Sequence, residues 1–213
     1  MKKEKTIKLY LVMTMKKVSN WLNTNSFKEQ DEYYTPKILV EAILPYLEKG
    51  KTIWCPFDTE NSECVVTLKE NGFKVIYSHI IYGQDFFVFE PNEEYHYIIS
   101  NPPFSRKLEV LERLYNLNKP FAMVLPLTML NYQEVGAFFL DKELQLLIVD
   151  KKVSFNGNTA SFNNSYYCYK LLPKDLMFTH LEHNNSNSNY VASRMNKDLK
   201  EDFKIEKENN KLF

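Results

Sequence analysis

Helical and strand-like segments alternate between positions 35 and 149 of this 213-residue chain, and this alternation constrains the fold more than any other feature. Apolar residues at helical spacing predict helices at 35–50, 64–71, 106–117 and 133–140. Short apolar runs predict strands at 52–55, 73–77, 97–99, 121–125 and 144–149. Strands that are joined through helices run parallel and need a helical cover on both faces. We therefore expect an α/β fold with a doubly wound, mostly parallel sheet.

Two later segments are expected to close the sheet. Val153–Phe155 and Ser165–Leu172 are strand-like, and the sequence between them contains Asn156-Gly157-Asn158, which is typical of a turn. They predict an antiparallel hairpin, which makes the expected sheet seven-stranded.

Four residues predict how the helices begin and bend. Thr35 is predicted to be an N-cap, with Pro36 at the first helical position. Pro45 predicts a kink in the same helix, because proline lacks the N–H that an interior helical position needs. Ser105 is predicted to cap the helix that follows it.

The composition is that of a globular protein in a reducing compartment. A hydrophobic content of 44% with 15% aromatic residues excludes global disorder, and only 5 Gly exclude collagen-like or Gly-rich classes. Three cysteines, none in a CxxC pair, leave one unpaired in any disulfide scheme. We expect a reduced, cytoplasmic protein.

The N-terminal region does not predict a membrane or export segment. The apolar run Leu9–Met15 is too short to span a bilayer, and no small-residue cleavage site follows it. The polar Asn/Ser-rich composition after position 183 predicts a tail outside the domain. We expect an N-terminal extension at 1–30, one domain at 31–183 and a polar, partly helical tail at 184–213.

A net charge of zero hides an uneven distribution. Up to Asn25 six Lys stand against one Glu, whereas from Asp58 to Glu94 eight acids stand against two Lys. A balanced total does not indicate nucleic-acid binding, so contacts with a polyanion must come from local patches. Solvated faces are the usual meaning of such runs. The alternative is an acidic stretch around a cationic ligand and a basic leader for a polyanion.

The sequence Ser100-Asn101-Pro102-Pro103-Phe104 directly follows the predicted strand at 97–99. Ligands of parallel sheets bind beyond the carboxyl ends of the strands. Two prolines fix the backbone and remove its N–H donors, which leaves carbonyls as acceptors. The side-chain oxygen of Asn101 and the carbonyl of Pro102 can accept both hydrogens of an exocyclic amino group, and Phe104 offers a face for stacking. The motif predicts a site for a planar amino-bearing substrate; the alternative is a rigid turn with Phe104 in the core.

With this motif the sequence resembles the amino-group DNA methyltransferases, in particular the phage-type adenine-N6 enzymes, whose [D/N/S]PP[Y/F] signature follows the fourth strand. The resemblance runs roughly from Asp31 to Pro173. It implies a class I methyltransferase domain, which is Rossmann-like, and S-adenosyl-L-methionine as the methyl donor. It also implies that DNA is the partner and that a target adenine is flipped out of the stack. No metal ion is implied, and the catalytic residues by this resemblance are Asn101, Pro102, Pro103 and Phe104.

Two further segments resemble the family where it binds the cofactor. Asp31-Glu32-Tyr33-Tyr34-Thr35-Pro36 is similar to the family's DE(W/Y)YTP segment, which implies that Tyr34 and Thr35 contact the cofactor. Gln84-Asp85-Phe86-Phe87 is similar to an acidic-plus-aromatic segment, which implies that Asp85 and Phe86 meet the adenine of the cofactor. Core packing for the tyrosine and simple capping for the threonine remain alternatives.

The loop after the first predicted strand departs from the family pattern D-P-F-x-G-x-G. It has no glycine and reads Cys55-Pro56-Phe57-Asp58-Thr59-Glu60-Asn61-Ser62. The resemblance implies that Pro56, Phe57 and Asp58 lie at the cofactor, with Glu60 as the alternative acid for its methionine end. Ser78-His79 stands where the family has an acid for the ribose hydroxyls. Glycine allows a backbone to approach a ligand closely, so this departure bears on cofactor binding.

The late region of the sequence is expected to line the pocket of the target base, as in similar enzymes. The residues expected there are Phe155, Asn158 and Phe162, with one of the two phenylalanines as a second stacking face. Basic residues flank the same side and are candidate phosphate contacts, with plain surface positions as the alternative for each. They are Arg106, Lys107, Lys151 and Lys152.

These features predict a methyltransferase that transfers a methyl group from S-adenosyl-L-methionine to the exocyclic amino group of adenine in DNA. RNA and a protein glutamine are alternative substrates, because NPP[F/Y] loops hold any planar amide or amine. A different class is a catalytically degenerate relative that binds nucleic acid or a protein as a decoy. Binding of the cofactor distinguishes this last class from the enzymes.

Overall fold

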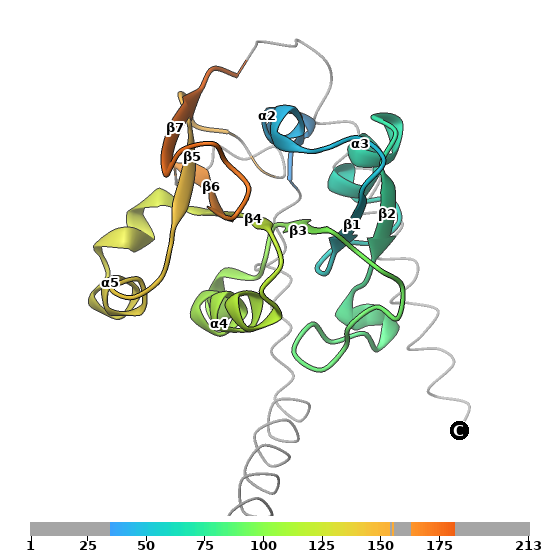
Figure 1. The fold of residues 1–213 in the computed structure, drawn as a ribbon, viewed down its shortest axis with the longest axis horizontal. Coiled ribbons are helices and arrows are strands. Elements are labelled where there is room, and N and C mark those ends of the chain that lie inside the picture. Colours follow the sequence, from blue (N-terminus) through green and yellow to red (C-terminus); the bar gives the residue numbers. More distant parts are fainter. Residues whose placement is uncertain (1–34, 154, 156–162, 182–213) are drawn as a thin grey trace, which may run out of the picture. The chain divides into compact units, whose positions relative to one another are not determined.

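The structure, a computed structural model, is built on a seven-stranded sheet with the strand order β2-β1-β3-β4-β6-β5-β7 (Figure 1). It describes residues 35–153, 155 and 163–181. Strands β1 to β4 pair in parallel, β6 runs antiparallel to β4 and β5, and β7 pairs in parallel with β5. The strands are β1 (Thr52–Cys55), β2 (Lys74–Tyr77), β3 (Tyr97–Ser100), β4 (Phe121–Pro126), β5 (Gln145–Val149), β6 (Asn164–Tyr169) and β7 (Leu176–Thr179). The predicted α/β fold with a mostly parallel seven-stranded sheet is confirmed.

The predicted hairpin is wrong in one of its strands. The antiparallel partner of β6 is β5, in a register that places Leu147 opposite Tyr166. Val153 belongs to no strand and Phe155 forms only an isolated bridge, although both are buried. The apolar residues at 153 and 155 fit a loop that crosses the core as well as a strand, because such a loop also presents apolar side chains to the core. The seventh place in the sheet belongs to β7, and the predicted turn at 156–158 lies outside the described residues.

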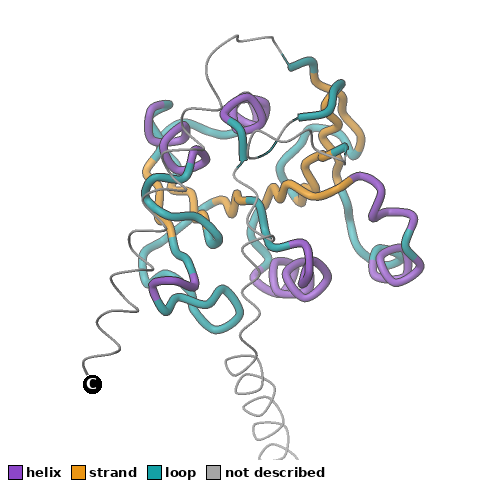
Figure 2. Tube along the Cα trace, turned by 180° about the vertical axis from the view of Figure 1, so that it is seen from behind, coloured by secondary structure: helices purple, strands orange, loops and turns teal. Residues whose placement is uncertain are grey.

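The helices lie on both faces of the sheet. Figure 1 shows α2 and α3 on one side and α4 and α5 on the other, and Figure 2 shows the same separation from behind. The helices are α2 (Lys37–Ile43), α3 (Glu63–Glu70), α4 (Lys107–Leu117) and α5 (Gln133–Phe138), and the 3-10 turns are η1 (Leu44–Tyr46), η2 (Ile80–Tyr82), η3 (Phe104–Arg106) and η4 (Leu127–Asn131). None of the described helices has the length and apolar composition that crossing a membrane requires.

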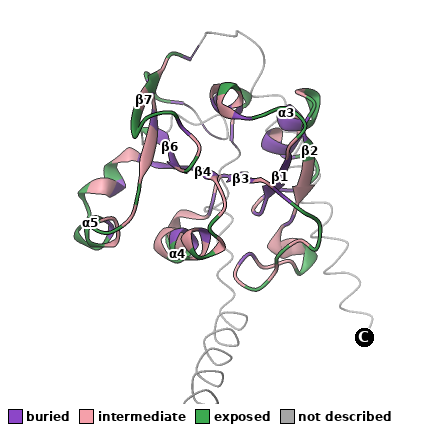
Figure 3. Cartoon of the chain, viewed as in Figure 1, coloured by how far each residue is buried: buried purple, intermediate pink, exposed green. Residues whose placement is uncertain are grey.

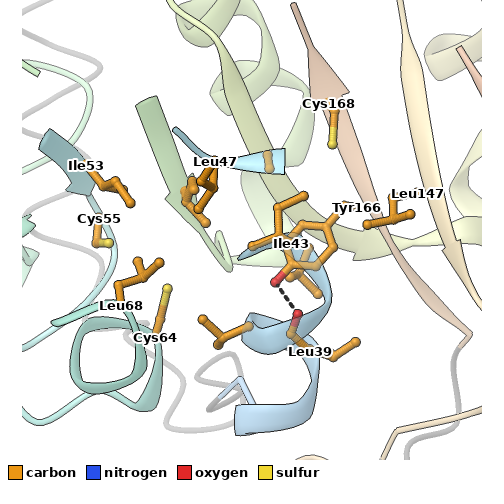
Figure 4. Packing of buried hydrophobic residues seen from close by; sticks show 14 of the residues in the cluster. Leu39, Ile43, Leu47, Ile53, Cys55, Cys64, Leu68, Leu147, Tyr166 and Cys168 are labelled. Carbon is orange, nitrogen blue, oxygen red and sulfur yellow. Dashed lines mark hydrogen bonds between the residues drawn. The ribbon is translucent and has the colours of Figure 1, made fainter. Parts of the chain in front are cut away.

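Strand side chains alternate between two core layers, as the period of two in a strand demands. On β1, Ile53 and Cys55 pack with α2 and α3, whereas Trp54 packs with the helices of the opposite face. Figure 4 shows part of the first layer, where the Tyr166 hydroxyl donates a hydrogen bond to the carbonyl of Leu39 (2.9 Å). Strands β1, β3 and β4 are buried along their whole length (Figure 3).

The predicted helix starts need correction. Pro36, not Thr35, is the N-cap of α2, and no side chain caps that helix. The Pro36 carbonyl accepts the Leu39 N–H instead (2.9 Å), while the threonine is buried. Ser105 does not cap α4, because the 3-10 turn η3 separates the two prolines from the helix and Arg106 becomes its N-cap. The predicted kink at Pro45 is instead the end of the α-helix, since α2 stops at Ile43, the 3-10 turn η1 follows, and the helix does not continue to position 50.

Candidate functional site

The parallel strands β1, β2 and β3 end at the same edge of the sheet, and their loops carry most of the polar residues singled out by the sequence. Asp58 follows β1, Ser78 follows β2, and Ser100 is the last residue of β3. Asn101 and Pro102 come next in the chain. Ligand sites of such sheets form at this edge.

A buried hydrogen-bond network joins the three loops. The Ser100 hydroxyl donates to the Asp58 carboxylate, and these residues are 2% and 7% exposed. The Asp58 N–H donates to the Ser78 carbonyl (3.2 Å), and the Ser78 N–H donates to the Cys55 carbonyl (3.1 Å). The network fixes the residue before Asn101 relative to the loop after β1.

Burial dominates the acidity of Asp58. It raises the pKa of this carboxyl to about 6, against the opposing effect of hydrogen bonds from Ser100 and Ser62. Ser62 also accepts the Thr59 N–H (2.8 Å), so its hydroxyl holds the same loop. Asp58 is therefore an acid that changes its charge near neutral pH.

This raised pKa predicts a pH-dependent stability. The native carboxyl binds its proton more tightly than the unfolded one, whose pKa is about 3.9, so the stabilisation is present below about pH 4 and lost as the pH rises through about 6. Between about pH 4.5 and pH 7.5, wild type should lose about 2 kcal/mol more stability than Asp58→Asn, which stays neutral. Urea unfolding at both pH values measures the difference. Equal losses in the two proteins would contradict the prediction.

The NPPF motif lies where the sequence predicted it. Asn101 is half-buried, Pro102 is buried and Pro103 is the N-cap of η3. The Pro103 carbonyl accepts the Arg106 N–H (3.3 Å). Phe104 is half-buried and packs against the core layer that contains α4. The alternative reading of Phe104 as a core residue thus holds in part, whereas its role as a stacking face stays a prediction.

The conformation of the loop after β1 does not require glycine. None of residues 55–62 has a positive φ, so no left-handed position there calls for glycine. Pro56 is buried, and Phe57 is half-buried. The missing glycines of the family pattern therefore cost this loop no backbone strain.

The acidic-plus-aromatic segment lies beside the same loop. The Phe86 ring is 4.8 Å from the Phe57 ring and 5.6 Å from the Trp54 ring. Phe86 is only 2% exposed, so its ring is part of the core. Asp85 is half-buried, and one of its carboxylate oxygens accepts the Phe87 N–H (3.0 Å).

Ser78 and His79, which follow β2, both form hydrogen bonds that stabilise the fold. The Trp54 indole N–H donates to the Ser78 hydroxyl (2.9 Å). The His79 ring nitrogen Nδ1 accepts the Ile81 N–H (3.3 Å), and burial lowers the pKa of this histidine to about 4. His79 is neutral at physiological pH and caps η2.

The cysteines offer no nucleophile. Cys55, Cys64 and Cys168 are buried free thiols. Burial raises the pKa of the Cys55 thiol, and the hydrogen bond between Cys55 and Cys64, together with burial, raises the pKa of the Cys64 thiol. Both therefore stay protonated, and the structure supplies no thiolate for covalent catalysis.

The residues expected at the target base are only partly described. Phe155 is 4% exposed and belongs to the core layer of α2 and α3. Asn158 and Phe162 lie outside the described residues, as does Tyr34 of the expected cofactor site. Among the basic residues, Arg106 forms an ion pair with Glu109 (2.6 Å), which reduces its availability to phosphates.

Asn164 is a candidate that the sequence analysis missed. It begins β6 opposite Pro126, the last residue of β4, and is 3% exposed. Its side-chain oxygen is buried and accepts no hydrogen bond within the described part of the chain. Buried acceptors normally have a donor, so this position suits a ligand that offers an N–H group. The only sequence signal is a polar Asn pair ahead of an aromatic strand.

No protein-family model matches the sequence, and no curated protein is significantly similar to it. Several solved structures are similar to the chain. One is the methyltransferase subunit of a type I restriction-modification system from Streptococcus thermophilus, with 12% identity and a TM-score of 0.45 over 80% of this chain and 53% of that one. This chain thus spans about half of that subunit.

The second is a protein from Listeria monocytogenes described as a class I S-adenosylmethionine-dependent methyltransferase, with 13% identity and a TM-score of 0.43 over 90% of this chain and 75% of that one. The third is a predicted O-methyltransferase from Agrobacterium tumefaciens, with 9% identity and a TM-score of 0.38 over 72% of this chain and 90% of that one. Likeness at this level says nothing about activity or substrate.

Proposed function

We propose that the chain transfers the methyl group of S-adenosyl-L-methionine to the exocyclic amino group of adenine in DNA. The observation that carries this proposal is the position of Asn101-Pro102-Pro103-Phe104 at the carboxyl end of β3, in the parallel part of the sheet. The Ser100–Asp58 hydrogen bond fixes this motif to the loop after β1.

The residues at this edge fit the cofactor in their chemistry. Asp58 and Asp85 are acids on two loops that are joined by the contact between the rings of Phe57 and Phe86, and Phe57 is only half-buried. Asp85 would hold the adenine part of the cofactor, and the loop at 56–58 would hold its methionine part. When bound, the cofactor supplies an electrophilic methyl group on a sulfonium centre.

The chain's own residues act on the amino group. The side-chain oxygen of Asn101 and the carbonyl of Pro102 accept its two hydrogens, which orients the nitrogen lone pair and increases its electron density. Phe104 contacts the base with the side of its ring that the core does not cover. Positioning and electrostatics of this kind supply the catalysis, without a metal ion or a covalent step.

Asn164 supports a planar amino or amide ligand independently of the motif. It lies on the second strand over from β3, about 10 Å away for two strand spacings, which is within the span of a nucleobase with its sugar. Its buried acceptor is of the kind that a ligand N–H would satisfy.

Labelled S-adenosyl-L-methionine tests the proposal. The purified chain should bind the cofactor in calorimetry and incorporate label into DNA, in preference to total RNA and protein. Label found mainly in RNA or in protein glutamine would show that this molecule, and not DNA, is the substrate. A chain that binds no cofactor at high micromolar concentration would instead be a degenerate methyltransferase-like binder.

A further inference from the structure

The segment Asp85–Phe89 belongs to no helix or strand, although it lies against the core. It forms a turn in which the Asp85 carbonyl accepts the N–H groups of Val88 (3.0 Å) and Phe89 (2.7 Å). The Asp85 side chain accepts the Phe87 N–H in the same turn. All these bonds are internal to the segment, so they set its shape but not its place on the domain.

Arg113 of α4 supplies the external anchor. Its two terminal nitrogens donate to the Phe87 carbonyl (3.0 Å) and to the Phe89 carbonyl (3.0 Å). Its guanidinium also lies 5.3 Å from the centre of the Phe86 ring. A charged, planar donor that reaches two carbonyls fixes both position and orientation, which one hydrogen bond cannot do.

The Arg113 side chain leaves one of its donor groups without an acceptor. Its Nε–H is buried and has no acceptor within the described part of the chain. A buried donor without a partner costs free energy. The two hydrogen bonds to the carbonyls therefore explain the buried guanidinium of Arg113 better than apolar packing around α4 does.

Helix α4 also begins directly after the NPPF motif and its 3-10 turn. Arg106, at the start of α4, stacks on the Phe87 ring at 3.6 Å. The same helix therefore contacts the turn of Asp85 through Arg106 and Arg113, and at its N-terminal end it continues from the amino-group motif. One rigid element links the two halves of the proposed site.

We propose that Arg113 is a positioning residue that holds the Asp85–Phe89 turn in place for the cofactor. This inference rests on the proposed function, because Asp85 would meet the adenine of S-adenosyl-L-methionine. Arg113 acts through the turn and touches neither cofactor nor substrate. Its loss should weaken cofactor binding and leave the transfer step, which depends on Asn101 and Pro102, unchanged once the cofactor saturates the protein.

The test compares Arg113→Gln, which loses the charge, with Arg113→Lys, which retains it and one donor group. Arg113→Gln should raise the dissociation constant for the cofactor by roughly tenfold or more, and Arg113→Lys should lie between it and wild type. The rate of transfer at saturating cofactor should stay within about twofold of wild type. Glu112→Gln, at the exposed neighbouring position of α4, is the matched control and should change neither quantity.

Hydrogen exchange without any ligand supplies an independent readout. The Val88 and Phe89 amides should exchange faster in Arg113→Gln than in wild type, while the amides of β4 stay protected. Unchanged exchange at these amides overturns the anchor. Faster exchange with an unchanged cofactor dissociation constant shows a purely structural contact and also overturns the proposal. If the wild-type chain binds no cofactor, the proposed function fails, and the role of Arg113 in cofactor binding fails with it. The exchange data would then still report whether Arg113 anchors the turn.

Discussion

Replacement of Asn101 by alanine should abolish most methyl transfer while the protein still folds and binds its cofactor. The side-chain oxygen of Asn101 is one of two acceptors for the amino group, and the Pro102 carbonyl alone cannot fix the orientation of the nitrogen. Loss of one such preorganised group typically lowers a rate by about 10²–10³-fold. Single-turnover transfer with labelled cofactor measures the rate, and calorimetry measures cofactor binding.

The control for this variant is Asn116→Ala, at an exposed position of α4. It removes the same side chain from the same protein without touching the carboxyl edge of the sheet, and its transfer rate should equal that of wild type. A wild-type rate in Asn101→Ala would mean that the NPPF motif is a turn and not a catalytic element.

Replacement of Trp54 by alanine should cause the largest loss of stability. Trp54 is fully buried, its ring lies 5.2 Å from that of Tyr95 and 5.6 Å from that of Phe86, and its indole donates to Ser78. Truncation of a buried tryptophan costs about 3–5 kcal/mol through lost contacts and the cavity that remains. Since domains of this size are stable by about 5–15 kcal/mol, much of the folding free energy would be lost.

Urea unfolding compares Trp54→Ala with Leu140→Ala, in which the replaced side chain is 86% exposed. The leucine variant should stay within about 0.5 kcal/mol of wild type. A loss below about 1 kcal/mol in the tryptophan variant would contradict the packing described for the layer of α4 and α5.

The sequence predicted the elements better than their ends. Strands such as β1 and β4 are runs of buried residues between clear breakers, so their positions were readable. The N-cap was predicted one residue too early, at Thr35, because the proline that follows it takes the N-cap position. The strand predicted at 153–155 is reduced to a bridge at Phe155, because two apolar residues separated by one position occur in buried loops as well as in strands.

The position of the NPPF motif was predictable from the sequence. Asn101 to Phe104 lie at a strand end as expected. Phe86 and Phe155 were expected to contact ligands and are in the core, because aromatic residues do not reveal from sequence whether they stack on a ligand or on one another. The Ser100–Asp58 bond joins residues 42 positions apart and depends on strand order, which single-sequence patterns do not encode.

The two clusters of contacts around the proposed site have different roles. The Ser100–Asp58 bond holds the motif against the loop after β1, and Arg113 holds the turn of Asp85 against α4. Substitutions in the first should change both the transfer rate and its pH dependence, since Asp58 titrates near neutral pH. Substitutions in the second should change cofactor affinity alone.

Nucleoside analysis of DNA tests the central claim most directly. Genomic DNA without N6-methyladenine is incubated with the purified chain and S-adenosyl-L-methionine, digested to nucleosides and analysed by mass spectrometry. The account predicts N6-methyl-deoxyadenosine with wild type and Asn116→Ala, formed at an initial rate about 10²–10³-fold lower with Asn101→Ala. DNA free of methylated adenine after incubation with a folded, cofactor-binding wild-type chain would contradict it.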